Sequence, residues 1–373
     1  PDRARARCRE FLESGPPRES ATRVLVLLGA LEFGAARLSA WKQGSADPAG
    51  WLAAGLVCCH RAALESGDSS DLRALVARVR DRAPRFVEPR VALAALLTRG
   101  GWSKEASEIL DEVLGEAPGN VLALGTRARM YGIANRDTES LADLSEAIRR
   151  DPTRAWMYLT RADILSARGE HGPALADVET AERLHPGRPT TAIRLGWELL
   201  DLGRLTAALE AADRGLAVDP GLWRGWLVRS RANLRLGEPR KALQEIDRAI
   251  EINPSLADLH LHRAECAIGV GDFGEAARAV TRSFSLKDPS ARTLALRSDC
   301  RRRDGDLPGA RRDAESALKA DPKSADAWLA LAGVRDLEGD RQGAGAAARS
   351  ALEHAPETWK GREEAERLRD RRE

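Results

Sequence analysis

The chain has 373 residues, of which 31% are charged and 4% aromatic, and its 59 Lys+Arg residues nearly balance its 57 Asp+Glu residues. The resulting formal charge of +2 argues against a protein that binds nucleic acid through a basic surface, since such proteins are usually far more lopsided in charge. The longest apolar run, near Val24 to Leu31, is much shorter than the roughly 20 residues that a membrane span needs. We therefore expect neither nucleic acid nor a membrane as a partner.

The first 52 residues are the least regular part of the chain. Residues 1 to 15 predict a short helix that ends near Gly15. Residues 17 to 52 predict a degenerate version of the repeat described next, closed by Pro48. Together, 1-52 are expected to form an N-terminal helix plus a degenerate or capping repeat.

From residue 53 onward a series of prolines divides the chain at spacings of 33 to 35 residues: Pro84, Pro118, Pro152, Pro186, Pro220, Pro254, Pro289, Pro322 and Pro356. A fixed period of this length is typical of stacked supersecondary structures, each of which contacts only its neighbours. Counting back 31 residues from a proline gives position 1 of a repeat, with a drift of one residue at Pro289. Each repeat is named below by its closing proline. The nine predicted repeats are 53-84, 87-118, 121-152, 155-186, 189-220, 223-254, 257-289, 291-322 and 325-356.

Each repeat carries the marks of two helices joined by a turn. Position 15 is glycine in most repeats, which suits a first helix that ends in a left-handed conformation. Small residues at positions 8, 20 and 27 would let the two helices cross closely. The closing proline cannot continue the second helix, so it ends one repeat before the next begins.

This pattern resembles the tetratricopeptide repeat family, whose consensus is large at position 4, small at 8, glycine at 15, alanine at 20 and 27, and proline at 32. The resemblance covers residues 53 to 356. Position 4 carries Trp226 and Trp328, with Tyr158 as a weaker fit, whereas Arg90 departs from the consensus. The resemblance implies an all-α fold, a right-handed α-α superhelix (TPR solenoid).

Residues 357-373 follow the last proline and are highly charged, with little to bury beyond Trp359 and Leu368. A solenoid needs a terminal element with a polar outer face. We therefore expect a charged C-terminal capping helix.

Positions 7 and 23 change together along the chain. Position 7 is arginine in five repeats: Arg127, Arg161, Arg229, Arg263 and Arg297. In four of these, position 23 is acidic: Asp143, Asp177, Glu245 and Asp313. Where position 7 is Cys59, Leu93, Leu195 or Leu331, position 23 is apolar. We interpret the two positions as facing each other across the helices of a repeat, with Arg263, opposite Ala279, free to act elsewhere. The alternative is coincidence in an arginine-rich sequence, because surface charges often pair without consequence.

Motifs for catalysis are absent from the sequence. There is no Walker-type glycine loop, no GxSxG and no HExxH. His262 and Cys266 lie four residues apart, a spacing that zinc can use on a helix, but two ligands do not make a site. We therefore expect no enzyme activity, no cofactor and no metal. The five cysteines are odd in number and scattered, which is typical of reduced thiols and favours a cytoplasmic location.

The resemblance implies that positions 2, 5, 6, 9, 12 and 13 line the concave face of the superhelix. Two tryptophans there are candidate apolar anchors, with packing between repeats as the alternative. The C-terminal half of this lining is rich in arginine, whose planar fork suits the carboxylates or phosphates of an acidic segment, although a merely solvated face is the alternative. The candidate partner-binding residues are Trp156, Arg194, Trp197, Arg224, Arg231, Arg235, His262, Arg292, Arg302 and Arg303.

The sequence therefore predicts a non-catalytic scaffold that binds a peptide or protein segment in the concave groove. One alternative is a regulatory or substrate-recruiting arm of a larger enzyme, such as a kinase, protease or transferase, which a chain that begins with Pro1 would fit. A weaker alternative is an RNA-binding helical repeat. A subgroup of the family binds the C-terminal tails of chaperones through asparagine at position 6, and no repeat here has asparagine there. We therefore expect no chaperone-tail partner.

Overall fold

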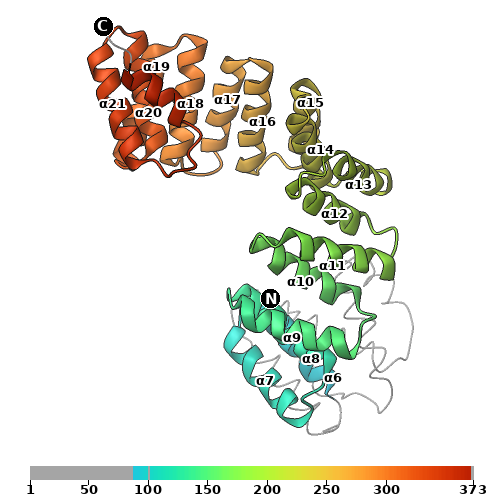
Figure 1. Cartoon of the computed structure of the whole chain (residues 1–373). Helices are drawn as coiled ribbons and strands as arrows, with labels where there is room; N and C mark the ends of the chain where they lie inside the picture. The colour runs from blue at the N-terminus through green and yellow to red at the C-terminus, as the bar shows by residue number, and fades with distance from the viewer. Residues whose placement is uncertain (1–86, 100, 371–373) are drawn as a thin grey trace, which may run out of the picture. The chain divides into compact units, whose positions relative to one another are not determined.

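A computed structural model describes residues 87–99 and 101–370 of the chain. All regular structure among these residues is α-helical, which confirms the predicted all-α class (Figure 1). None of the helices described has the length and apolar character needed to cross a lipid bilayer. The described residues divide into two compact lobes, one ending at His185 and the other beginning at Pro186. The predicted N-terminal segment 1-52 and the repeat 53-84 lie outside the described residues, and the division into nine repeats stays a prediction.

Within each lobe, helices pack in successive pairs, and the second helix of one pair packs on the first helix of the next. The N-terminal lobe contains α6 (Glu88–Arg99), α7 (Ser103–Glu116), α8 (Val121–Ile133), α9 (Asp137–Arg150), α10 (Ala155–Ala167) and α11 (His171–Leu184). The C-terminal lobe contains α12 (Pro189–Asp201), α13 (Leu205–Val218), α14 (Trp223–Arg235), α15 (Pro239–Ile252), α16 (Ala257–Val270), α17 (Phe273–Phe284), α18 (Ala291–Asp304), α19 (Leu307–Ala320), α20 (Ala325–Leu337), α21 (Arg341–His354) and α22 (Arg362–Asp370).

The turn between the two helices of each pair depends on position 15. Its glycines have φ angles between 73° and 91°, in the left-handed region: Gly101, Gly169, Gly203, Gly237, Gly271, Gly305 and Gly339. The Pro152 repeat has no glycine there, and Asn135 takes the same conformation with φ 57°. Asparagine is the residue that best tolerates this region after glycine. The conformation predicted for position 15 is thus confirmed.

Position 4 closes the junction between consecutive repeats. A large side chain with a polar tip at this position forms a hydrogen bond with the carbonyl oxygen of the proline six residues earlier. The pairs are Trp226 Nε1 with Pro220 (2.9 Å), Trp328 Nε1 with Pro322 (2.9 Å), Tyr158 Oη with Pro152 (3.2 Å) and His260 Nε2 with Pro254 (3.0 Å). A carbonyl beyond a helix end needs such a partner when it is shielded from water.

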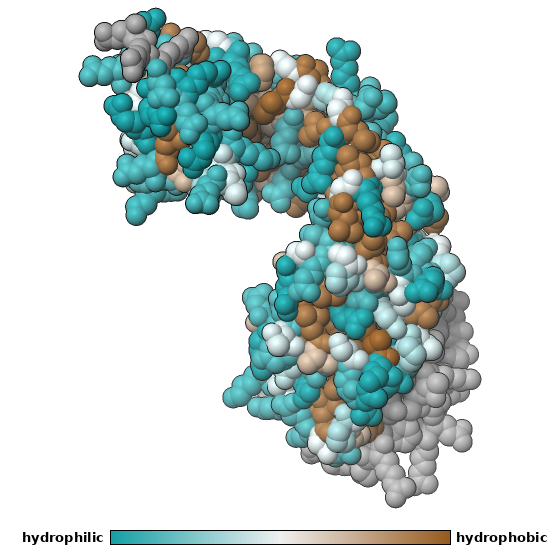
Figure 2. Space-filling view, in the orientation of Figure 1, coloured by the Kyte–Doolittle hydropathy of each residue, from teal (hydrophilic) through white to brown (hydrophobic). Residues whose placement is uncertain are grey.

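Small buried residues lie where the two helices of a hairpin cross, as predicted. In three repeats a serine hydroxyl donates directly to a carbonyl oxygen of the facing helix: Ser140 to Ala128 (2.6 Å), Ser230 to Ala242 (2.8 Å) and Ser298 to Ala310 (2.7 Å). Larger apolar side chains such as Leu227, Ile246 and Leu259 fill the space between hairpins. On the surface, apolar residues are interspersed among hydrophilic ones, which predominate over the C-terminal helices in the view of Figure 2.

The four arginine–carboxylate pairs between positions 7 and 23 are confirmed. The Nε atoms of the arginines lie 2.7 to 2.8 Å from carboxylate oxygens in the pairs Arg127–Asp143, Arg161–Asp177, Arg229–Glu245 and Arg297–Asp313. All four acidic residues are buried. Hydrogen bonding to Asp143 and Asp177 raises the pKa of Arg127 and Arg161 above its usual value, although burial opposes this shift. Arg127 and Arg161 are therefore charged in the folded protein.

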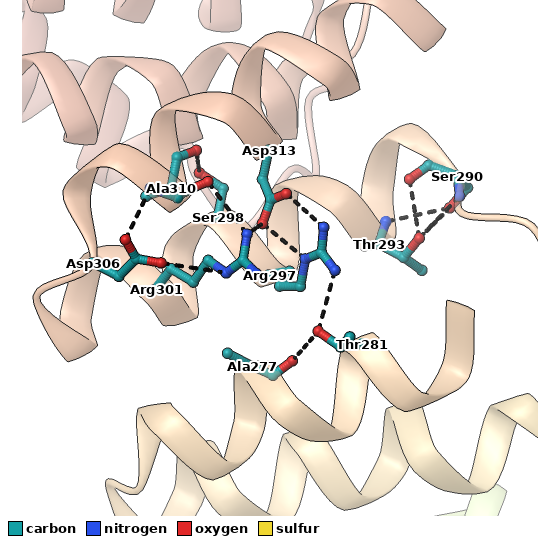
Figure 3. Close-up of polar contacts among 11 residues, drawn as sticks. Ala277, Thr281, Ser290, Thr293, Arg297, Ser298, Arg301, Asp306, Ala310 and Asp313 are labelled. Carbon is teal, nitrogen blue, oxygen red and sulfur yellow. Dashed lines mark hydrogen bonds and ion pairs between the residues drawn. The ribbon is translucent and has the colours of Figure 1, made fainter. Parts of the chain in front are cut away.

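Each of these arginines also reaches the second helix of the preceding repeat, at position 25. In Figure 3, Arg297 lies between Asp313 of α19 and Thr281 of α17. The other contacts of this kind are Arg127 with Asp111 (3.2 Å), Arg161 with Ser145 (3.4 Å), and Arg229 with Asp213. We call an arginine at position 7, together with its partners on both second helices, an arginine bridge. One side chain thus ties three helices together.

The expectation that Arg263 is free is wrong. Its Nε donates to Asp247 of the preceding repeat over 2.6 Å, and its Nη1 bonds Glu275. Ala279 at position 23 offers no carboxylate, so Glu275, one turn earlier on α17, supplies it. The fifth arginine therefore also forms an arginine bridge.

Removing the acidic residue of an arginine bridge should lower the free energy of unfolding more than removing an exposed acidic residue. Asp177→Ala leaves Arg161, whose side chain is 24% exposed, without its main partner, and we expect a loss of about 2 kcal/mol in unfolding free energy. Glu170→Ala removes an exposed pair with Arg168 and should cost well under about 1 kcal/mol. Urea and thermal unfolding of the two variants would measure this, and equal losses would contradict the bridge.

Candidate interaction face

The residues predicted to line an inner face lie on the first helices of the hairpins. In the C-terminal lobe, α12 contacts α14 and α14 contacts α16, so these first helices lie side by side. Position 9 of three successive repeats therefore brings together Trp197, Arg231 and Glu265, one from each helix. We call these three residues the position-9 column.

Arg231 and Trp197 are in direct contact. The guanidinium carbon of Arg231 lies 5.1 Å from the centroid of the Trp197 ring, a cation–π arrangement. Trp197 is half-buried and packs against the apolar cluster of Leu227, Ile246 and Leu259. The indole thus has one side in the core and carries the guanidinium on the other, which restricts how far Arg231 can move.

Three arginines of this face have no carboxylate within ion-pair distance among the described residues. They are Arg224, Arg231 and Arg292. Arg224 and Arg292 are exposed, and Arg224 lies over Trp223, with its guanidinium carbon 4.8 Å from the ring centroid. Other arginines of the C-terminal lobe, such as Arg229, Arg263 and Arg297, are paired with a neighbouring acid. Arg224, Arg231 and Arg292 are therefore available to an external anion.

Glu265 is the acid closest to this group. Its pKa lies below the usual range, chiefly because His262 bonds it, with Nδ1 2.9 Å from Oε2, and also because Arg231 and Arg292 are near. The column therefore alternates an aromatic ring, a cation and an anion along three helices.

His262 does not lie on the surface of this face. Only 4% of it is exposed, and its Nε2 lies 3.0 Å from Ser230 Oγ and 3.7 Å from Cys266 Sγ. Its predicted role as a residue that contacts a partner conflicts with this burial, which follows from the small serine at position 8 of the preceding repeat. Burial raises the pKa of Cys266 to about 11, so this thiol is protonated and unreactive. Among the described residues no group of three His, Cys, Asp or Glu side chains could hold a metal ion.

Arg302 and Arg303 of α18 are already neutralised. Arg302 Nη2 lies 2.5 Å from Asp299 and 3.4 Å from Glu364 of α22, and Arg303 Nε lies 2.8 Å from Asp299. Gly333 leaves room for the Arg302 side chain to reach α22, because a Cβ at position 333 would lie only 2.9 Å from Arg302 Nε. Arg302 therefore attaches the terminal helix α22 to α18 through its ion pair with Glu364.

The remaining predicted residues are spread out. Arg235 donates from Nη1 to the carbonyl of Leu200 over 2.6 Å, and Arg194 is half-buried on α12. Trp156 belongs to the N-terminal lobe, where it packs into the space left by Gly125 and carries Arg129 at 5.7 Å from its ring. Among the predicted residues, Trp197 and Arg231 are in direct contact, and Arg231 and Arg292 both lie near Glu265.

Glu265 occupies position 9, one of the positions expected to line the concave face, although it was not among the candidate partner-binding residues. One part of this arrangement was missed by reasoning from the sequence. The role of Gly333 depends on a contact between residues 62 positions apart, for which the repeat pattern holds no signal.

A family model for the tetratricopeptide repeat matches residues 193–257 and 299–357 of the chain. Both segments lie in the C-terminal lobe, where the hairpins, the left-handed turns and the closing prolines recur in phase. In these two segments the chain carries tetratricopeptide repeats.

Individual relatives match only parts of this repeat protein. It is 28% identical over 117 residues to cellulose synthase operon protein C of Pseudomonas fluorescens (strain SBW25), covering 31% of this chain and 9% of the relative. It is 34% identical over 87 residues to the Hsp70-Hsp90 organizing protein of Triticum aestivum, covering 23% of this chain and 15% of the relative. The matched segments therefore span less than a sixth of these relatives' own length.

Solved structures share the fold. A tetratricopeptide repeat protein from Parabacteroides merdae ATCC 43184 superimposes with a TM-score of 0.52 at 17% identity, covering 67% of this chain and 97% of that chain. At this identity the likeness concerns the fold alone. It supports an all-α superhelical repeat.

The depressed pKa of Glu265 predicts a pH dependence of stability. Because the folded pKa lies below that of the unfolded chain, the carboxylate stabilises the fold above about pH 5, and this contribution is lost as pH falls through the folded value. Glu265→Gln should therefore show a smaller drop in Tm between about pH 5 and pH 3 than the unaltered chain. Thermal melts across this range test the prediction, with the exposed Glu353→Gln as the control, and parallel curves for all three proteins would contradict it.

Proposed function

We propose that this repeat protein is a non-catalytic scaffold that holds an acidic, extended protein segment against the first helices α12, α14, α16 and α18. Its tetratricopeptide repeats support a role in protein interaction. The observation that carries the finer proposal is Arg231, a guanidinium held on the face of Trp197 with no carboxylate paired to it.

An arginine in this state suits an anionic guest. Binding a guest through a free arginine usually costs conformational entropy, because the long side chain must become ordered. The contact with Trp197 already orders part of the Arg231 side chain, which lowers this cost. A carboxylate that approaches Arg231 can accept two hydrogen bonds from its planar fork. Trp197 adds an apolar surface beside the charge, a combination typical of residues that dominate binding energies.

Arg224 and Arg292 extend the site along the stack. They lie at position 2 of the Pro254 and Pro322 repeats and are both exposed. Glu265, between Arg231 and Arg292, would repel a guest whose negative charges are continuous. We therefore expect a segment in which acidic residues alternate with neutral or apolar ones.

This charge pattern separates the proposed guest from two others. A nucleic acid backbone presents a continuous row of phosphates, which the alternating column and the overall charge of +2 disfavour. A chaperone tail is disfavoured by position 6, which holds Arg194, Val228, His262 and Leu296 in these repeats and no asparagine. The chain is similar over 87 residues to the Hsp70-Hsp90 organizing protein, but these repeats still have no asparagine at position 6.

A peptide-display selection tests the proposal. The full chain is immobilised and challenged with a library of random 16-residue segments, and we expect the enriched sequences to carry spaced Asp and Glu. The affinity of an enriched peptide should fall at least about ten-fold in Trp197→Ala plus Arg231→Glu, which corresponds to about 1.4 kcal/mol. It should also fall as salt rises, because screening weakens exposed charge pairs.

Arg240→Glu is the matched control, since it makes the same charge reversal at an exposed site on the second helix α15. All variants are first compared with the unaltered chain by circular dichroism and Tm. Equal binding losses in the control and the test variant, or a selection without acidic residues, would contradict the proposal.

A further inference from the structure

The arginine bridges contain an irregularity at position 25, on the second helix of the preceding repeat. Three of the five bridges have a carboxylate there, in the pairs Asp111–Arg127, Asp213–Arg229 and Asp247–Arg263. The other two have a hydroxyl, Ser145 facing Arg161 and Thr281 facing Arg297. At these two places a residue that accepts phosphate stands where the other bridges have a fixed negative charge.

At Thr281 a neutral hydroxyl occupies the place that a carboxylate has in three of the other bridges. Arg297 Nη1 donates to Thr281 Oγ1 over 3.1 Å, and the Thr281 hydroxyl in turn donates to the Ala277 carbonyl over 2.8 Å (Figure 3). Arg297 is largely buried, whereas Thr281 is exposed. The guanidinium therefore already points at the oxygen atom to which a phosphate would be attached.

A further cation lies on the same face of α17 as this hydroxyl. Arg278 is one helical turn before Thr281 and is exposed. Arg278 is paired with Glu275 at the start of α17. Residues three apart on a helix are neighbours on its surface, so Arg278 can reach a phosphate on Thr281.

Ser145 lacks these features. Ala142, and not an arginine, lies three residues before it. Arg161 Nη1 is 3.4 Å from its oxygen, farther than Arg297 Nη1 is from that of Thr281. The observations therefore favour Thr281 over Ser145.

The end of α17 makes Thr281 accessible to an enzyme. The second helices α15 and α19 end at position 30, with Ile252 and Ala320, but α17 ends at Phe284, two positions earlier. Only three helical residues follow Thr281, in the repeat whose closing proline is displaced by one residue. Helix ends open locally at small free energy, so the hydroxyl can leave the helix without unfolding the repeat.

We propose that Thr281 is a phosphorylation site, and that its phosphorylated side chain completes the arginine bridge between the Pro289 and Pro322 repeats. A protein kinase would transfer the γ-phosphoryl group of a nucleoside triphosphate to Thr281 Oγ1. The bond from phosphorus to the leaving oxygen breaks, the hydroxyl proton passes to the base of the kinase, and the nucleoside diphosphate departs. Arg278, three residues before the acceptor, fits kinases that select arginine at that place.

The consequence is a stronger junction between α17 and α18. A phosphate brings nearly two negative charges to a guanidinium that now receives only a neutral hydroxyl, and such pairs form short, strong hydrogen bonds. Phosphorylation would thus stabilise one specific step of the repeat stack. This inference is independent of the guest proposed for the first-helix face.

The acceptor role is tested with a purified kinase that selects arginine three residues before the acceptor. The full chain offers an internal control, because Thr153 is exposed in a loop and has Arg150 three residues before it. Mass spectrometry should locate phosphate on both Thr281 and Thr153. Phosphate on Thr153 with none on Thr281 would overturn the proposal.

The bridging role is tested by incorporating phosphothreonine at position 281 during synthesis of the full chain. We expect Tm to rise by about 2 °C or more, and the rise to vanish in Arg297→Gln. Phosphoserine at Ser316 is the matched control: this exposed residue of α19 has Arg312 and Lys319 as helical neighbours but no hydrogen bond to a guanidinium among the described residues. A rise equal to that control, or a rise that persists in Arg297→Gln, would contradict the bridge.

A second measurement does not depend on the stability of Arg297→Gln. In ³¹P NMR of the otherwise unaltered chain, the second ionisation of the phosphate at 281 should occur at lower pH than that of phosphothreonine 153. Identical titrations of the two phosphates would contradict a contact with Arg297.

Discussion

Within each lobe, a first helix that follows another described repeat lies between two second helices, its own and that of the preceding repeat, and the side chain at position 7 lies where the three meet. A guanidinium at this place can bond both second helices at once, as Arg297 does with Asp313 and Thr281. Leucine fills the same place in other repeats, where position 23 is apolar. The fold therefore accommodates either kind of side chain, and the guanidinium takes its carboxylate from position 23 or, for Arg263, from Glu275 one turn earlier.

This constraint also determines which side of the first helices remains for a partner. Position 7 turns one side of each helix toward the second helices, and position 4 is occupied by its hydrogen bond to the preceding proline. Position 9, on the remaining side, carries Trp197, Arg231 and Glu265. On α14, charges that stabilise the stack are thus separate from charges that a guest can reach. Arg229 is paired with Glu245, whereas Arg231, two residues later, has no paired carboxylate.

Features that recur in phase could be predicted from the sequence. The prolines indicated the hairpins, the glycines indicated the left-handed turns, and the joint change of positions 7 and 23 indicated four ion pairs. What could not be predicted depends on contacts that do not repeat. Arg263 finds Glu275 because Ala279 has no carboxylate, and Arg302 reaches Glu364 because Gly333 leaves room for it. His262 is buried because Ser230 of the preceding repeat is small, a property of one pair of neighbours.

The most direct test of this account is to build an arginine bridge where the chain has none. The Pro356 repeat has Leu331 at position 7 and Ala347 at position 23, both buried, and Glu315 already stands at position 25 of the preceding repeat. We predict that Leu331→Arg and Ala347→Asp each lower the unfolding free energy by about 2 kcal/mol or more, because each buries a charge without its main partner. The double variant should recover at least about 1 kcal/mol of the summed loss, measured by urea unfolding. Losses that simply add would contradict the claim that positions 7 and 23 act as one unit.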